Sequence, residues 1–326
     1  MNSGRISMMF FIIPLLATIH LNHPANTYEP EPSIAYSFRL PLEGAWSPLA
    51  QDFNKWNEDW CGYHLGEDVK CDPDAKIYPT ADGIVKFAQQ TVMGYTVIIE
   101  HKLPYGEYVC SVYYHLKKPE DGGIKLEENK VVYKTNPIGY VSGRPEDYGP
   151  FPHLHFGIRK EKYTRGRDPR TEKWYYPGYT AIYKEGILQC NPEDPAHQWI
   201  LKEWFDPCDF LSQYLEPSKK FNTGECVRTA DDLKIRNSPK IRDDNTMPPV
   251  LRKGSVGQVL YDKNNGAFVD GYYWWYAQFG DKNGWCAENW LEKIQPSAEI
   301  FSYNDWIEAS GRAGQINFEA VEEAIQ

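Results

Sequence analysis

The chain lacks the excess of basic residues that binding to nucleic acid requires. Its 326 residues contain 35 lysines and arginines against 45 aspartates and glutamates, a formal net charge of -10 at pH 7. Neutralising phosphates needs a basic patch, so we expect no nucleic-acid partner. Hydrophobic residues make up 41% of the chain and charged residues 25%, which is typical of a folded, soluble protein. The length allows two domains with separate cores.

The N-terminal apolar run is too short to span a bilayer, which takes about 20 residues. This run, from Met8 to Ile19, follows one basic residue, Arg5, and precedes a polar, proline-bearing stretch. The arrangement predicts a secretory signal peptide over residues 1–25, without a clear cleavage position. We therefore expect export to a periplasm, the cell exterior or the cell wall, with no stable membrane span after cleavage.

Cysteine is absent before residue 61, which argues against a lipid-modified cysteine near the N-terminus. Seven cysteines in an exported chain predict disulfides, with one thiol left over. Spacing alone does not fix their connectivity. Proximity along the chain favours the pairs Cys61–Cys71, Cys190–Cys208 and Cys226–Cys286, with Cys110 unpaired inside a strand.

Continuous helical periodicity is absent from residues 33–160. Short β-branched or aromatic runs recur there instead, separated by turn signals such as ADG, LPYGE and EDGG. The runs are GIVKFAQQ, YTVIIEHK, YVCSVYYHL and HFGIRK. They predict a mainly β protein built on an antiparallel sheet.

Internal repeats and low-complexity tracts are also missing, so the domain limits come from changes in composition. Residues 161–221 are aromatic and proline-bearing, with one short helix expected at PAHQWILKEWF, and they elaborate the first domain. A second β module is expected over residues 222–295, where strands alternate with glycine and asparagine turns. Residues 296–326 form a tail that we expect to be a short helix or loose.

Histidine is scarce, but four of the 8 histidines lie in β-rich contexts together with one acid. In FPHLHFGIRK, His153 and His155 are one residue apart on an expected strand, so both point to one face, roughly 7 Å apart. Upstream, in GYHLGEDVKCDPD, His64 and Asp68 are four residues apart with Gly66 between them. The glycine and the β pattern that follows favour a loop entering a strand.

An imidazole and a carboxylate can converge on one cation, and zinc accepts that mixture of ligands. A catalytic zinc site keeps three protein ligands and an open position for water. His64, Asp68 and one histidine of the 153/155 pair make that count, and the other histidine then acts on the water. His115 is a fifth candidate, at the end of the YVCSVYYHL strand. Regular alternation would place it on one face with Val109, Ser111 and Tyr113.

Taken singly, these patterns also occur without any function, and spacing alone leaves a structural role equally open. His101, at a strand end, and His197, in the expected helix, are assigned structural roles. Glu67 lies beside the candidate ligands but points the opposite way in an extended segment, so we do not expect it to act as a base.

Taken together, the motifs resemble the lysostaphin/LytM-type zinc metallopeptidases, which are peptidoglycan endopeptidases. HLGEDV, IYPTADGIVKFA, GYTVIIEH, YYHL, NPIGYVSG and PHLHFGI follow that family's order and spacing from about residue 43 to 160. Carried over by position, the resemblance implies that His64, Asp68 and His155 bind Zn2+ and that His115 and His153 are catalytic. It also implies the duplicated hybrid motif fold, with an open groove for the peptide part of peptidoglycan.

Beyond the elaboration, LKIRNSPK, KGSVGQVL and VDGYYWWYAQFGDKNGWCAENWL resemble bacterial SH3-like domains. Such domains commonly attach hydrolases to cell walls, so the resemblance implies a small β-barrel and a cell-wall partner. The expected organisation is a signal peptide (1–25), a peptidase domain (26–221), an SH3-like domain (222–295) and a tail (296–326).

The H-E-x-x-H motif, whose glutamate is the base of other zinc peptidases, is absent. Histidines must therefore move the protons. One of His115 and His153 is expected to orient or deprotonate the water, and the other to stabilise the tetrahedral oxyanion. Because imidazole titrates near pH 6.5, we expect activity to fall in mild acid.

Other readings of the same sequence stay open. A wall-anchored adaptor that activates other hydrolases would keep the peptidase fold without catalysis, although the complete ligand set argues against it. An exported protease for glycine-rich proteins would share the site and differ in substrate. The stretch from Asn26 to Leu49, close to the polar run DFNKWNEDW, would also be able to block the metal.

Overall fold

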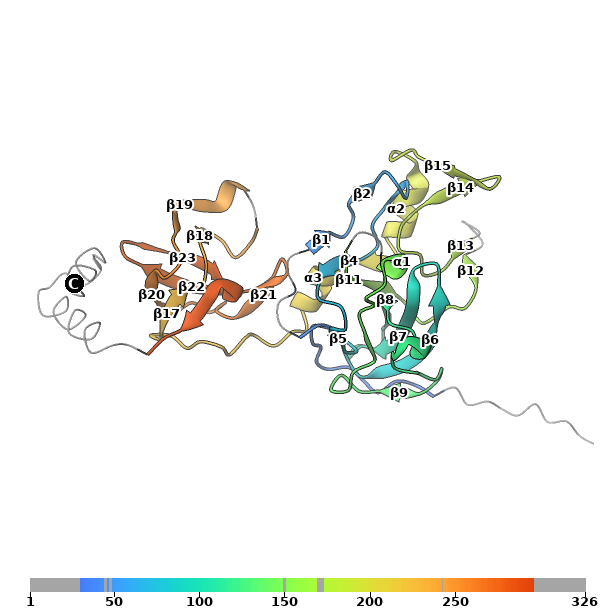
Figure 1. The fold of residues 1–326 in the computed structure, drawn as a ribbon, viewed down its shortest axis with the longest axis horizontal. Helices are drawn as coiled ribbons and strands as arrows, with labels where there is room; N and C mark the ends of the chain where they lie inside the picture. Colours follow the sequence, from blue (N-terminus) through green and yellow to red (C-terminus); the bar gives the residue numbers. More distant parts are fainter. Residues whose placement is uncertain are drawn as a thin grey trace, which may run out of the picture. The chain divides into compact units, whose positions relative to one another are not determined.

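The computed structural model describes residues 30–43, 46, 49–148, 151–168, 173–241 and 243–295. The expected signal peptide and the tail over residues 296–326 lie outside this part. Antiparallel β structure dominates the described residues (Figure 1), which confirms the predicted fold class. None of the helices in the described ranges is both long and apolar enough to cross a membrane.

The first sheet has eight strands, in the order β1-β4-β11-β8-β7-β6-β9, with β16 also paired to β11. Its strands are β1 (Leu49–Gln51), β4 (Glu67–Lys70), β6 (Gly83–Thr91), β7 (Gly94–Lys102), β8 (Tyr108–Leu116), β9 (Val131–Val132), β11 (His153–Lys160) and β16 (Trp204–Phe205). The four runs expected from the sequence become β6, β7, β8 and β11. Their β-branched and aromatic residues suit a sheet that is buried on both faces.

Each face of this sheet packs against a separate apolar cluster. Tyr113 and Phe156 belong to the larger cluster, together with Val69 of β4. Val112 and Tyr114 point the other way and belong to a second cluster with residues of the elaboration. Because side chains alternate along a strand, β7 and β8 each present residues to both clusters.

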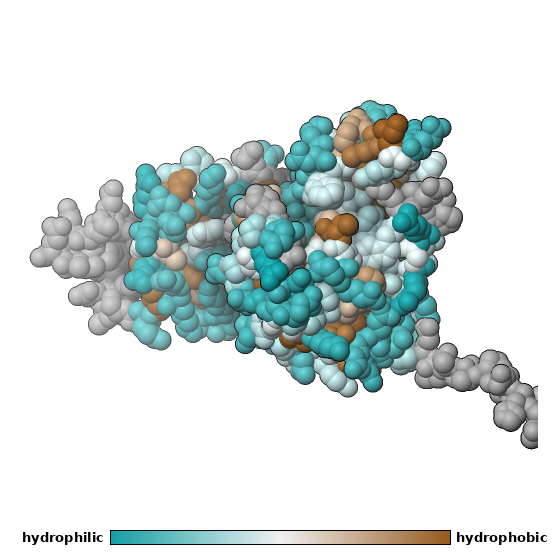
Figure 2. Space-filling view, turned by 45° about the vertical axis from the view of Figure 1, so that its right-hand side comes forward, coloured by the Kyte–Doolittle hydropathy of each residue, from teal (hydrophilic) through white to brown (hydrophobic). Residues whose placement is uncertain are grey.

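Short elements connect these strands, and between them they pack on both faces of the sheet. They are β2 (Trp56–Asn57), β3 (Gly62–Tyr63), β5 (Lys76–Ile77), η1 (Pro119–Asp121), β10 (Gly139–Tyr140), α1 (Pro145–Tyr148), β12 (Arg167–Asp168), β13 (Lys173–Trp174), β14 (Ile182–Lys184), β15 (Ile187–Gln189), α2 (Pro195–Leu201) and α3 (Pro207–Ser212). The helix expected at residues 195–205 is shorter than its motif, since Trp204 and Phe205 form β16 instead. Figure 2 shows separate apolar areas on a mostly hydrophilic face.

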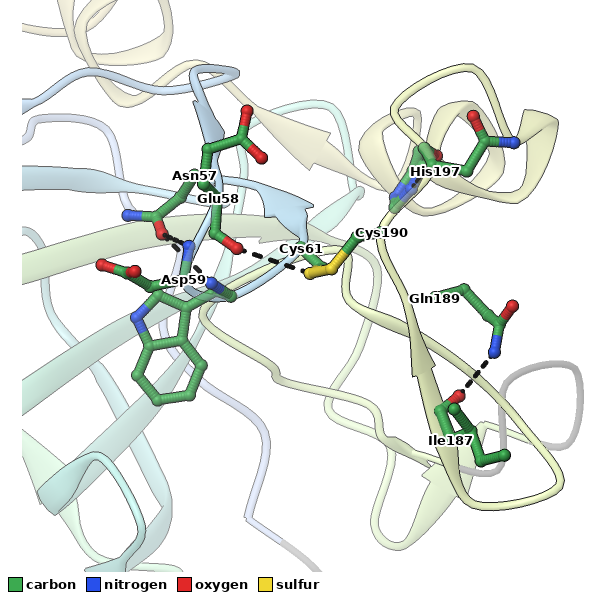
Figure 3. The surroundings of a disulfide bond; sticks show 10 residues. Asn57, Glu58, Asp59, Cys61, Ile187, Gln189, Cys190 and His197 are labelled. Atoms are coloured by element: carbon green, nitrogen blue, oxygen red, sulfur yellow. Dashed lines mark hydrogen bonds between the residues drawn. A yellow bond between two sulfur atoms is a disulfide. The ribbon is translucent and has the colours of Figure 1, made fainter.

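The single disulfide among the described residues joins Cys61 to Cys190 (Figure 3), so the expected pairs Cys61–Cys71 and Cys190–Cys208 are wrong. Hydrogen bonds explain the difference: the Leu65 amide donates to the Gly178 carbonyl and the Thr180 amide to the Tyr63 carbonyl, at 2.9 Å each. These bonds hold the elaboration against β3 and bring together two cysteines that are 129 positions apart in the sequence.

The third expected pair is wrong as well, because Cys226 and Cys286 remain thiols. They lie on β17 and β23, and the sheet order places β20 and β22 between those two strands. Cys110 is a buried thiol inside β8, as expected.

A second antiparallel sheet occupies the C-terminal described residues, in the order β19-β18-β23-β22-β20-β17-β24, with β21 paired to β22. Its elements are β17 (Cys226–Thr229), β18 (Leu233–Arg236), η2 (Asp243–Asn245), β19 (Thr246–Leu251), β20 (Val256–Val259), β21 (Ala267–Val269), β22 (Tyr272–Phe279), β23 (Lys282–Ala287), η3 (Glu288–Trp290) and β24 (Leu291–Lys293). Buried residues such as Val227, Ile235 and Trp275 form its core. The SH3-like character of this module and the domain limits remain predictions.

Candidate metal centre

The register between β4 and β11 decides where the paired histidines point. Asp68 is directly opposite His155, and Lys70 is opposite His153. Since side chains on directly opposite residues share a face, Asp68, His153 and His155 all face the elaboration side of the sheet. His153 Nε2 lies 3.6 Å from Asp68 Oδ1, which confirms that the two histidines of the pair reach one point.

Three polar atoms converge at this point. His64 Nε2 lies 2.9 Å from His155 Nδ1 and 3.1 Å from Asp68 Oδ1. His155 Nδ1 and Asp68 Oδ1 are 3.0 Å apart, which closes a nearly equilateral triangle of buried atoms. Tetrahedral zinc ligands at about 2.0–2.1 Å from the metal lie roughly 3.3 Å from one another. The expected ligands therefore fit one zinc ion in both chemistry and spacing.

Hydrogen bonding outside the triangle prepares His64 to be a ligand. Its Nδ1 lies 3.1 Å from the Asp52 carbonyl oxygen. A carbonyl oxygen can only accept a hydrogen bond, so the nitrogen that faces it must carry a proton. The proton is therefore on Nδ1, and the lone pair of Nε2 faces Asp68 and His155. Proteins usually orient a metal-binding imidazole in this way, through a hydrogen bond from the ring nitrogen that does not bind the metal.

The protonation states also suit a divalent cation. Burial lowers the pKa of His155 to about 4, against the opposing effect of its hydrogen bond to Asp68. For Asp68, burial would raise the pKa, but the adjoining imidazoles of His155 and His64 hold it well below its usual value. A neutral imidazole at His155 and an ionised carboxylate at Asp68 are the forms in which these side chains bind a metal ion.

His115 and His153 stand beside the triangle, as the sequence predicts. Their rings are 4.5 Å apart, and the His115 ring is 6.3 Å from that of His155. The Nδ1 of His153 lies 3.0 Å from the Phe151 carbonyl oxygen, so this nitrogen carries a proton and Nε2 is left as the acceptor. Both residues are buried, with exposed fractions of 7% for His115 and 6% for His153.

The way in which His115 reaches the site differs from the expectation. Regular alternation would turn it to the face of Tyr113, away from the metal ligands. His115 instead has a φ of 63°, a left-handed conformation that is uncommon for a residue with a side chain. Two backbone hydrogen bonds hold it there, from its amide to the Met93 carbonyl and from the Ser142 amide to its own carbonyl. The predicted sharing of one face with Val109, Ser111 and Tyr113 is therefore wrong.

Two further residues shape the surroundings of His155. The Tyr114 ring is stacked on the His155 ring, 4.7 Å away and inclined by 22°, and its hydroxyl donates to the Tyr176 carbonyl. A Cβ atom on Gly66 would lie 2.7 Å from His155 Nε2 and 2.6 Å from the Phe156 carbonyl oxygen. Only glycine fits between the two upstream ligands, which gives a reason for the residue within the HLGED motif.

The remaining polar residues named from the sequence lie elsewhere. His101 is hydrogen-bonded to the Asp82 carbonyl and to Ser111, and His197 to Thr180 and the Asn191 carbonyl. Glu67 points to the opposite face, as expected, where the Trp46 indole donates to it. Sequence reasoning missed the orienting roles of Asp52 and Tyr114, because neither follows from local spacing.

Residues 62–169 match the model of Peptidase family M23. This M23 domain contains all five residues that the structure gathers, from His64 to His155. The matched range includes the upstream pair, the left-handed His115 and the strand that bears both paired histidines. No curated protein matches the chain.

Solved structures resemble parts of the chain at low sequence identity. A zinc-containing peptidase from Vibrio cholerae is 23% identical, with a TM-score of 0.31, and the match covers 38% of this chain and 37% of that protein. Lysostaphin from Staphylococcus simulans is 14% identical over 80% of this chain and 97% of its own, with a TM-score of 0.36. The catalytic domain of EnpA from Enterococcus faecalis is 19% identical, covering 38% and 87%, with a TM-score of 0.29. The chain thus spans little more than a third of the Vibrio peptidase.

Proposed function

We propose that this protein is an exported zinc metalloendopeptidase that hydrolyses peptide bonds in peptidoglycan cross-links or stems. The convergence of His64 Nε2, Asp68 Oδ1 and His155 Nδ1 within about 3 Å of one another carries the proposal. The match to Peptidase family M23 supports the peptidase assignment. Export and attachment to the wall rest on the N-terminal apolar run and on the SH3-like resemblance.

His64, Asp68 and His155 would hold the zinc ion. A zinc ion in such a site supplies Lewis-acid chemistry, which acidifies water and polarises a scissile carbonyl group. The protein's own contribution is orientation. Asp52 fixes the tautomer of His64, and the Tyr114 ring fixes the plane of His155.

We assign the two remaining histidines different roles in moving protons. His153 donates from Nδ1 to the Phe151 carbonyl, so its Nε2 is free to accept a proton beside Asp68. This geometry suits a general base, which must present a lone pair at the reacting centre. His115 lies beside His153, with 4.5 Å between the ring centres, and there it would stabilise the developing oxyanion.

Two measurements on the full-length protein test the proposal. Metal analysis should find close to one equivalent of zinc, and incubation with purified peptidoglycan should release new peptide termini, identified by mass spectrometry of the muropeptides. A chelator should abolish the release without unfolding the protein. Zinc-loaded protein that leaves muropeptides intact would instead favour the adaptor that activates other hydrolases.

A further inference from the structure

Each of β4 and β11 presents one lysine or arginine to the face of the sheet that bears the candidate metal ligands. On β11 it is Arg159, which is buried and donates to the Glu203 carboxylate at 2.7 Å. On β4 it is Lys70, which is exposed. No ion pair within the described ranges engages Lys70. One positive charge on this face is therefore neutralised, and the other is not.

Backbone pairing fixes Lys70 beside the proposed general base. Lys70 is directly opposite His153 in the register of β4 and β11, and the side chains of opposite residues share a face. The Cys71 amide donates to the Pro152 carbonyl oxygen, at 3.5 Å, which continues this pairing past the end of β4. A side chain held on a strand is positioned more precisely than one on a loop.

The ammonium group of Lys70 lies over an aromatic ring that is next to His153. Its Nζ is 5.0 Å from the centre of the Phe151 ring, and that centre is 5.5 Å from the centre of the His153 ring. A cation over an aromatic face is attracted by the ring quadrupole, which holds the ammonium group near the site. These two distances place Nζ within roughly 11 Å of the His153 ring, a span that an extended peptide covers in about three residues.

The charges on this face favour an anion as the partner of Lys70. Asp68, the acid that shares this face of β4, directs its Oδ1 to His64 and His155 at 3.1 and 3.0 Å. It therefore leaves Lys70 without a counter-ion. A lysine ammonium group has three donors and no acceptor, so its natural partner is a carboxylate. A peptide bound for cleavage beside His153 would bring its own carboxylate within reach.

We propose that Lys70 binds a carboxylate of the peptide substrate and so helps to select which bond is cut. The carboxylate belongs either to a side chain or to the C-terminus of the peptide. From the distances through Phe151, it lies within about three residues of the cleaved bond. This inference rests on the proposed peptidase function and names the substrate feature that the enzyme selects.

Matched muropeptides test the subsite. In one pair a side-chain carboxyl group of the stem peptide is either free or amidated, and in the other pair the C-terminal carboxyl group is. Calorimetry on the full-length, chelator-treated protein measures binding without hydrolysis, and kinetics on the zinc-loaded protein measure KM and kcat. In at least one pair we expect the free acid to bind about three- to tenfold more tightly than its amide. The pair that shows this preference identifies the source of the carboxylate.

Three changes at one position test the charge. Lys70→Gln should remove the preference, chiefly through KM, Lys70→Arg should keep most of it, and Lys70→Glu should reverse it. Zinc content and the unfolding midpoint should stay at their wild-type values, because the side chain is exposed. Lys234→Gln, which removes the same charge from an exposed position of β18, is the control and should keep the preference. Added salt should weaken binding of the acid forms alone.

The outcomes distinguish this inference from the function on which it rests. Equal binding of acid and amide in both pairs overturns the subsite, even if all four probes are hydrolysed. A preference that Lys70→Gln leaves intact also overturns it, since the carboxylate would then be recognised elsewhere. A preference that depends on Lys70 without any hydrolysis supports the subsite and contradicts the peptidase.

Discussion

At the scale of single residues, the proposed function gives different tasks to two histidines that are two positions apart. His155 presents Nδ1 to the triangle of ligand atoms, whereas His153 presents Nε2 beside Asp68 and is hydrogen-bonded to the Phe151 carbonyl. The ring nitrogen that each one uses follows from its hydrogen-bond partners. A ligand and a proton acceptor should therefore respond differently to the same substitution.

His155→Ala should lose zinc, because two ligands that remain on β4 and its preceding loop rarely retain the metal against a chelator. His153→Ala should keep close to one equivalent of zinc and lose hydrolysis by a factor of about 10² or more. Zinc content and the rate of muropeptide release check both variants. Loss of zinc from His153→Ala would show that this residue is itself a ligand.

At the scale of elements, the buried carboxyl group of Glu67 links β4 to helix α3 on the face of the sheet opposite the candidate metal ligands. Glu67 accepts hydrogen bonds from the Trp46 indole and from the Cys208 thiol, the latter at 3.1 Å. Burial and, to a smaller extent, the nearby charge of Asp206 raise the pKa of Glu67 to about 8. The carboxyl is therefore protonated at neutral pH and ties together three segments that the sequence separates widely.

This buried acid makes stability depend on pH in a defined direction. An unfolded glutamate ionises near pH 4.5, whereas folded Glu67 holds its proton to about pH 8, so the stabilisation is complete below the first value. It is lost as the pH rises through the second, by on the order of a few kcal/mol. Denaturant unfolding at pH 5 and pH 9 should show this loss in the wild type.

Glu67→Gln keeps the shape and the hydrogen bonds of the protonated acid, so its unfolding free energy should vary far less over the same range. Glu185→Gln, at an exposed position of the elaboration, is the matched control and should behave like the wild type. A wild type whose stability is flat between pH 5 and pH 9 would contradict this account of Glu67.

At the scale of the whole molecule, the elaboration over residues 161–221 contacts the candidate metal ligands and their neighbours. It supplies Tyr176, whose carbonyl oxygen accepts a hydrogen bond from the hydroxyl of Tyr114, the residue stacked on His155. It also supplies Tyr179, whose ring lies beside that of His64. One covalent bond, Cys61–Cys190, joins it to the loop that leads into the ligands. The elaboration and the disulfide therefore support the metal centre.

Removing that bond should weaken the fold. Cys190→Ser opens a loop of 129 positions, and we expect the unfolding free energy to fall by about 2–5 kcal/mol. Reducing agent should lower the unfolding midpoint of the wild type to that of the variant and leave the variant unchanged. A midpoint that reductant does not alter would show that the bond adds no stability. Cys226→Ser, which changes a thiol, serves as control.

Much of the site was predictable because its signals are local. The spacing of His153 and His155, with alternation along a strand, already places them on one face. The glycine between His64 and Asp68 predicts a loop, which the structure confirms with β4 beginning at Glu67. The strands β6, β7, β8 and β11 follow from runs of β-branched and aromatic residues for the same reason, since each run carries its own propensity.

What only the tertiary structure decided depends on partners far away in the sequence. His115 turns toward the ligands because Met93 and Ser142 hold its backbone in a left-handed conformation that no local pattern encodes. Cys61 meets Cys190 because the Gly178 and Tyr63 carbonyls organise a ladder between two distant segments. Short-range propensity fixes strands and loops, whereas the pairing of these elements sets which polar atoms meet, and so the metal centre depends on both.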